Sequence, residues 1–129
     1  MDRSRIVIGN LGRRTFATRP EHSAEAVGNS GVVVLSSASL IWFIETACAD
    51  AIRDCYDEGE VCIGVGFNLT HLAPSAIGQP VDAIARVESV DGIKIGFEVT
   101  ARVRDRIVMA GTHQRAVVDL QRFLNGAGL

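Results

Sequence analysis

The sequence predicts an α+β fold in which a curved antiparallel sheet wraps around one long central helix. Residues 36–56 begin with serines, which are good N-caps, and are apolar on all sides from Leu40 to Ile44. Almost everything after Gly59 alternates apolar with polar or small residues, which is the period of β-strands. One further strand-like stretch precedes the helix. A buried helix combined with such strands predicts a sheet that curls around it.

The chain is expected to form a single domain over residues 1–129, since this length can bury one substantial core but not two. Its 13 basic and 15 acidic residues give a net charge of −2, which argues against nucleic acid as the main partner. No apolar run approaches the ~20 residues of a membrane span, and the polar start lacks the apolar segment of a signal peptide. We therefore expect a cytoplasmic protein without membrane or nucleic-acid partners.

The three cysteines, Cys48, Cys55 and Cys62, are evenly spaced but do not match a metal-binding motif. The first two lie two helical turns apart, about 10 Å by helical rise, which is too far for a disulfide. They are interpreted as small buried side chains in a reducing compartment, and no metal is expected.

Before the helix, residues 13–18 are expected to form an edge strand that Pro20 ends. Residues 21–27 are expected to form a short helical turn, and residues 28–31 a glycine-rich loop. Residues 32–35 then lead into the helix, which residues 57–60 end.

After the helix, the strand pattern is clearest where apolar residues alternate with polar ones, as between Ile93 and Val103. Asp91-Gly92 is a strong hairpin signal, and residues 104–106 are expected to turn the chain again. The predicted strands are residues 61–73, 81–90, 93–103 and 107–120. A long open sheet edge is an aggregation hazard, so we expect a second copy to pair with it in a homodimer.

Glu45 lies within the most apolar part of the helix, and no cation three or four residues away can pair with it. An unpaired buried carboxylate costs several kcal/mol or loses its charge. Its partner must come from elsewhere in the fold, unless Glu45 reaches solvent. A structural arginine is one alternative and a catalytic residue is the other.

His71 is in phase with the odd-numbered apolar residues of strand 61–73, which predicts that it faces the helix and Glu45. A histidine on an apolar face is more often a structural residue. Here Glu45 is a second polar group without a local partner in the same layer, which favours a catalytic role for the pair. His22 is expected at the surface. His113 is expected either to be structural or to line a pocket.

A hydroxyl, an imidazole and a carboxylate together can support nucleophilic or general-base hydrolysis. Ser36, Ser37 and Ser39 all lie at the helix start, where each is also a candidate N-cap. The free N–H groups of a helix N-terminus suit a carbonyl oxygen or an oxyanion. No Gly-x-Ser-x-Gly motif, phosphate loop or zinc pattern is present.

Three blocks of sequence resemble the hotdog-fold thioesterases, in the branch that contains the fluoroacetyl-CoA thioesterase. They are Glu45-Thr46-Ala47-Cys48, Asn68-Leu69-Thr70-His71 and Gly111-Thr112-His113-Gln114-Arg115-Ala116-Val117. The resemblance runs roughly from Arg13 to Phe123 and includes the spacing between the blocks. It implies the hotdog fold.

The resemblance also implies a site. The family's catalytic hydroxyl, glutamate and histidine fall on Ser37, Glu45 and His71, with serine in place of the family's threonine. A glycine and an arginine near the family's site fall on Gly64 and Arg115.

The aromatic lid of the fluoroacetyl-specific enzyme falls on Gly31, which predicts weak selectivity for fluoroacetyl groups. Trp42 and Phe43 are candidates for pocket walls, although both also fit a plain core.

The resemblance implies hydrolysis of a short acyl-CoA to the free acid and CoA, with Ser37, Glu45 or an activated water as the attacking group. No cofactor is implied, since CoA is part of the substrate. Two alternatives are a hotdog-fold hydratase or dehydratase acting on acyl thioesters, and a non-catalytic, dimeric acyl-CoA-binding domain.

Overall fold

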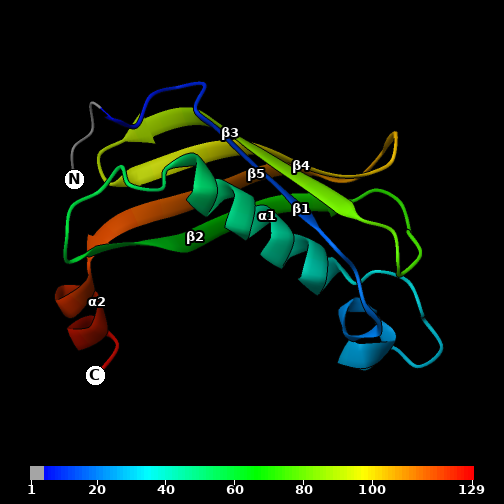
Figure 1. The fold of residues 1–129 in the computed structure, drawn as a ribbon. Coiled ribbons are helices and arrows are strands. Elements are labelled where there is room, and N and C mark those ends of the chain that lie inside the picture. Colours follow the sequence, from blue (N-terminus) through cyan, green and yellow to red (C-terminus); the bar gives the residue numbers. More distant parts are fainter. Residues whose placement is uncertain (1–4) are drawn as a thin grey trace.

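A computed structural model describes residues 5–129 and has the predicted α+β architecture, with one long helix lying against a curved five-stranded antiparallel sheet (Figure 1). The strand order in the sheet is β1-β3-β4-β5-β2. The strands are β1 (Leu11–Phe16), β2 (Glu60–His71), β3 (Val81–Asp91), β4 (Lys94–Val103) and β5 (Arg106–Asp119). The helices are α1 (Ser37–Ala51), α2 (Leu120–Gly126) and two 3-10 turns, η2 (Pro20–His22) and η3 (Glu25–Val27). None of the helices in this described part is long and apolar enough to cross a membrane.

Helix α1 begins as predicted but ends earlier. Ser36 is its N-cap, and the Ser36 side chain accepts a hydrogen bond from the Ser39 backbone N–H. The helix ends at Ala51, so the prediction that it continues to Tyr56 is wrong. Asp54 adopts a left-handed conformation (φ 65°), which is incompatible with a continuing helix.

The core lies between α1 and the sheet. The helix contributes Leu40, Phe43, Ile44 and Ala47, all fully buried. Strand β1 crosses the second half of the helix at Gly12, where an added Cβ would lie 2.0 Å from the Ala47 carbonyl oxygen. Only glycine allows the strand and helix backbones to approach this closely.

Strands β3 and β4 confirm the alternation read from the sequence. The inward residues of β4 are Ile95, Phe97, Val99, Ala101 and Val103, all buried. The hairpin at Asp91-Gly92 is present, with Asp91 paired to Lys94. Ile93 lies in the turn and is 49% exposed, so its predicted place on the inward face is wrong.

Strand β2 changes phase in its middle, which the sequence pattern does not reveal. Gly64 pairs with Arg115 and Gly66 with the adjacent Gln114, so Val65 is the extra residue of a β-bulge. Before the bulge the even-numbered residues face the helix, as Gly64 does, and after it the odd-numbered ones do, as Leu69 does. The predicted inward direction of Val61 and Ile63 is therefore wrong.

The C-terminal helix α2 was not predicted. The strand pattern was expected to run to about Leu120, but β5 ends at Asp119, whose side chain caps α2 by accepting from the Arg122 backbone N–H. None of the residues of this short helix is buried. Without an apolar face packed on the core, it has no strong periodic signal in the sequence.

Candidate active site

The first cluster of candidate residues lies at the N-terminus of α1. The Ser37 hydroxyl oxygen is 2.7 Å from Nδ1 of His71, which is the last residue of β2. Ser36 is the N-cap, and its hydroxyl accepts from the Ser39 backbone N–H and donates to the Ser39 hydroxyl, so both side chains are engaged with each other and not with His71. The structure therefore singles out one of the three serines, the same one that the family resemblance indicates.

His71 has one engaged and one unengaged ring nitrogen. Its Nδ1 meets Ser37, while its Nε2 is buried and has no hydrogen-bond partner among residues 5–129. A pocket of about 300 Å³ opens beside the ring, lined by Val34, His71 and the three residues that follow. A histidine with a free nitrogen next to a hydroxyl and a pocket can take up or deliver a proton.

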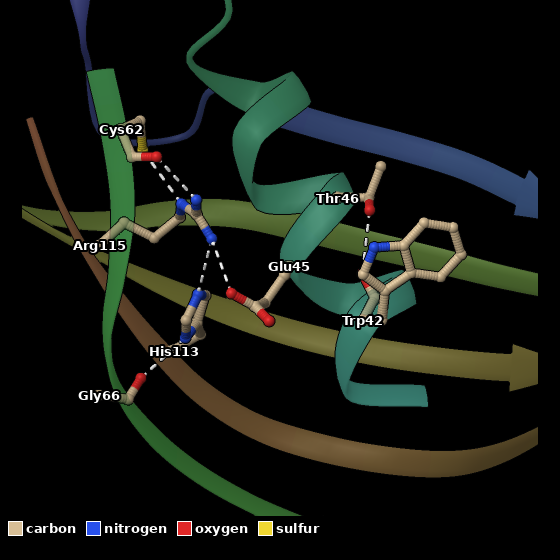
Figure 2. A network of polar contacts seen from close by, with 7 residues as sticks. All are labelled: Trp42, Glu45, Thr46, Cys62, Gly66, His113 and Arg115. Atoms are coloured by element: carbon tan, nitrogen blue, oxygen red, sulfur yellow. Dashed lines mark hydrogen bonds and ion pairs between the residues drawn. The ribbon is translucent and has the colours of Figure 1, made fainter. Parts of the chain in front are cut away.

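The second cluster lies in the middle of α1, where Arg115 of β5 forms an ion pair with Glu45 (Figure 2). The Arg115 Nη1 to Glu45 Oε2 distance is 3.2 Å, and the two side chains are 10% and 33% exposed. Gly64 faces the same carboxylate, and an added Cβ there would lie 2.8 Å from Glu45 Oε2. The carboxylate position thus depends on the absence of a side chain at Gly64.

Arg115 is held on every side. Its Nε donates to the Cys62 sulfur at 3.0 Å, its Nη2 donates to the Cys62 carbonyl oxygen at 3.0 Å, and its Nη1 also reaches His113 Nε2 at 3.3 Å. Such a guanidinium cannot turn away, and it fixes the carboxylate of Glu45 on the helix.

His113 completes the second cluster in a defined tautomer. Its Nδ1 donates to the Gly66 carbonyl oxygen at 2.7 Å, and its Nε2 accepts from Arg115. Burial lowers the pKa of His113 below its usual 6.5; Arg115 lowers it further, while the Gly66 hydrogen bond and Glu45 oppose the shift. His113 is therefore a neutral acceptor that supports the arginine.

The two clusters do not touch within one chain. Ser37 and Glu45 are eight residues apart on α1, about 12 Å by helical rise. No hydrogen bond or ion pair in the described part of the chain joins Glu45 to His71. Glu45 does obtain its partner from elsewhere in the fold, but this partner is the arginine, the alternative considered above, and not His71.

The remaining predicted residues lie outside both clusters. Gly31 lies in an exposed loop with φ 81°, and an added Cβ would meet nothing within 4 Å. Phe43 is fully buried core, whereas Trp42 is 54% exposed and is not a core residue in the single chain. His22 is half-buried rather than at the surface, with its ring against Phe43 at 5.3 Å.

The cysteines differ in their surroundings. Cys48 is buried, and burial raises the pKa of its thiol to about 12, so it is an inert core residue as expected. Cys55 and Cys62 are only half-buried, so the prediction that they are buried is wrong for both. The Cys62 sulfur accepts a hydrogen bond from Arg115. The sequence pattern does not predict this contact, because the bulge alone turns the even-numbered residues of early β2 toward the helix. Among residues 5–129, no group of three or more histidine, cysteine or acidic residues could hold a metal ion.

Comparisons with known proteins identify the family of the chain. A family model described as fluoroacetyl-CoA-specific thioesterase matches residues 18–121. The fluoroacetyl-CoA thioesterase of Streptantibioticus cattleyicolor is 30% identical over 90 residues, which are 70% of this chain. The aligned region covers 65% of that protein, slightly less than two thirds of its length.

Solved structures show the same fold. A threonine-to-serine mutant of the fluoroacetyl-CoA thioesterase in complex with acetyl-CoA superposes with a TM-score of 0.88 at 24% identity, covering 95% of this chain and 96% of that one. A hot-dog-like protein from Thermanaerovibrio acidaminovorans superposes with a TM-score of 0.89 at 20% identity, covering 98% of this chain and 95% of that one. The sheet-around-helix fold predicted from the sequence is thereby confirmed as a hotdog fold.

Proposed function

The chain belongs to the fluoroacetyl-CoA-specific thioesterase family, and from this premise we propose that it hydrolyses short acyl-CoA thioesters with Ser37, Glu45 and His71. The observation that carries the proposal is the 2.7 Å contact between the Ser37 hydroxyl and His71 beside a pocket. Structures of the family's fluoroacetyl-CoA thioesterase are described as complexes with acetyl-CoA and with fluoroacetate and CoA, which favours the same substrate class here.

In the proposed reaction, an oxygen nucleophile adds to the thioester carbonyl carbon. The C–S bond then breaks, the CoA sulfur receives a proton, and water supplies the oxygen and the proton that complete the free acid and the thiol. His71 accepts the proton of Ser37 or of a water and returns it to sulfur. Backbone N–H groups at the start of α1, or the N–H of Gly64, hold the carbonyl oxygen as negative charge develops on it.

The role of Glu45 follows from its fixed position. One of its oxygens is engaged by Arg115, and the side chain is one-third exposed, so substrate can reach it. It serves either as a second base that aligns water or as the attacking carboxylate. Trapping by hydroxylamine in the Ser37→Ala variant separates the two, once the direct reaction of hydroxylamine with acyl-CoA is subtracted. An acyl-Glu45 intermediate yields enzyme-dependent hydroxamate, whereas direct attack of water yields none.

We propose that the working form is a homodimer. Strand β2 lies at a sheet edge, and the apolar side chains of Val65 and Phe67 are 48% and 50% exposed on it. On the neighbouring helix, Trp42 is equally exposed. An edge of this length with apolar side chains favours pairing with another strand, and a second copy offers the same strand. Pairing of two copies would also bring a second set of both clusters to the interface.

Release of free thiol from an acyl-CoA panel tests the activity. A thioesterase releases CoA in proportion to acid formed, whereas a hydratase or dehydratase changes the acyl chain without releasing thiol. A non-catalytic binder is stabilised by CoA in a thermal melt without any turnover.

Light scattering measures the oligomer, and Val65→Lys is expected to produce monomers with much reduced activity. A monomeric wild type at micromolar concentration with full activity would contradict the dimer.

A further inference from the structure

A second pocket lies at the end of the sheet where β4 turns into β5. Its volume is about 450 Å³, and its polar wall is formed by Ser75, Gln79, Arg104, Asp105 and Arg106. It shares Pro74 with the pocket beside His71, so the two pockets are neighbours along the chain segment that follows β2.

The backbone ties this second pocket to the start of α1. The Leu35 backbone N–H donates to the Ser75 carbonyl oxygen at 2.9 Å, and Val34 forms an antiparallel bridge with Ala76. Figure 1 shows the β4–β5 turn, the loop after β2 and the first turn of α1 at the same end of the molecule. The two pockets therefore lie at the same end of the molecule, on either side of Pro74.

The second pocket contains an arginine whose guanidinium group is oriented by a hydrogen bond. Arg104 has a left-handed backbone (φ 54°), and its Nε donates to the Gln79 side-chain oxygen at 3.0 Å. This bond orients the guanidinium and leaves both Nη groups available. Within residues 5–129, no ion pair engages Arg104 or Arg106. The Ser75 hydroxyl is also buried without a hydrogen-bond partner in this range.

We propose that this pocket binds the phosphates of the CoA nucleotide, an inference that rests on the proposed function. The two guanidinium groups outweigh the single carboxylate of Asp105, so the wall keeps a net positive charge, and their N–H groups match the acceptor geometry of a phosphate. The CoA thioester and the CoA phosphates lie at opposite ends of a flexible pantetheine arm, so the phosphates must bind at a distance from His71. His71 pairs with Met109 on β5. Arg106 lies three residues before Met109 on the same strand, which is about 10 Å away.

The decisive experiment compares two substrates that carry the same acyl group. One is the acyl-CoA, and the other is the N-acetylcysteamine thioester, which lacks every phosphate. In the double variant Arg104→Gln/Arg106→Gln, KM for acyl-CoA is expected to rise about tenfold with little change in kcat, since hydrogen bonds to charged groups are among the stronger ones. KM for the truncated thioester is expected to stay constant. Arg86→Gln, an exposed arginine on β3, is the matched control.

Two further measurements keep the outcome clear. The Arg106 side chain makes no hydrogen bond or ion pair within residues 5–129, so Arg106→Gln alone tests the site if Arg104 proves necessary for folding. Calorimetry with CoA measures binding without turnover, and weaker CoA binding in the variants supports the proposal even for a chain that hydrolyses nothing. Equal CoA affinity in wild type and double variant, or an equal rise of KM for both substrates, would overturn it. Absence of turnover in the wild type would refute only the proposed function.

Discussion

The two clusters on α1 contain similar chemical groups but differ in how completely their hydrogen bonds are satisfied. At the helix start, Ser37 and His71 form one short contact, and the second nitrogen of His71 has no partner within residues 5–129. In mid-helix, Arg115 engages a carboxylate, an imidazole, a sulfur and a carbonyl oxygen together.

This difference separates a group that can exchange a proton from groups that hold a position. A saturated network resists rearrangement, because breaking any bond leaves a buried polar atom unpaired. A histidine with one free nitrogen next to a pocket has capacity left for substrate. The first cluster is therefore expected to control kcat, and the second is expected to control stability and the placement of Glu45.

The largest effect is expected from His71→Ala, because this change removes the proposed proton acceptor. General acid–base catalysis contributes about 10²- to 10⁴-fold, so kcat should fall by that factor while the melting temperature stays close to wild type. Glu45→Gln should also remove most activity. If both residues serve one site, the double variant should cost little more than the worse single variant. Losses that multiply would show that the two clusters act independently.

Arg115→Met is expected to have the largest effect on stability. It leaves the partly buried Glu45 carboxylate and the His113 nitrogen without their donor, and the expected loss is about 2 kcal/mol because Glu45 is still one-third exposed. Arg86→Met, whose pair with Glu98 is exposed, should cost less than ~1 kcal/mol. Urea denaturation measures both. Adding Glu45→Gln to Arg115→Met should recover part of the loss, and a further loss instead would contradict a charge-holding role for Arg115.

His113 links the second cluster to pH. Its pKa is lowered in the folded protein, so the unfolded chain binds the proton more readily as pH falls below 6.5. The contribution of neutral His113 is complete above that pH and is lost as pH falls toward the folded pKa, by at most about 1.4 kcal/mol per pH unit. Urea midpoints between pH 7.5 and pH 5 should drop less in His113→Gln than in wild type. His22→Gln is the control, and the same slope in all three proteins would exclude the effect.

The three serines at the helix start should separate capping from catalysis. Ser36→Ala removes the N-cap acceptor and should cost about 1 kcal/mol in stability with kcat retained. Ser37→Ala should leave the melting temperature unchanged but lower kcat, and Ser39→Ala should have the weakest kinetic effect. Normal turnover in Ser37→Ala would remove the hydroxyl from the proposed mechanism and leave water with His71.

The smallest effect is expected in the discrimination between fluoroacetyl-CoA and acetyl-CoA, where Gly31 stands in place of an aromatic lid. Gly31 brings no side chain near the pocket, and an added Cβ there would meet open space. Without an aromatic gate, kcat/KM for fluoroacetyl-CoA and acetyl-CoA should agree within about tenfold, since apolar contacts with one small group discriminate weakly. Butyryl-CoA and a branched acyl-CoA should also be accepted. A preference for fluoroacetyl-CoA by several orders of magnitude would show that another residue forms the gate.

Much of the fold follows from local patterns in the sequence. Strands β3 and β4 have periodicities that their burial confirms, because each packs one side against a single core. The helix itself is also predicted, but burial on all sides from Leu40 to Ile44 is not found, since Trp42 is 54% exposed. Local neighbours also show that Glu45 requires a partner. The direction of His71 follows from its phase with Leu69, on the same side of the bulge, and not from its phase with Val61 and Ile63. These conclusions depend only on neighbours within a few residues, which the sequence specifies directly.

The tertiary structure decided how distant segments meet. One extra residue at Val65 reverses the faces of β2, so Gly64 and Cys62 face the helix, and the pairing of β5 with β2 then brings Arg115 to Glu45. The choice of Ser37 over Ser36 likewise depends on where β2 ends relative to α1. No local pattern contains this information, because the energies of bulges and strand registers are set by contacts between residues far apart in the chain.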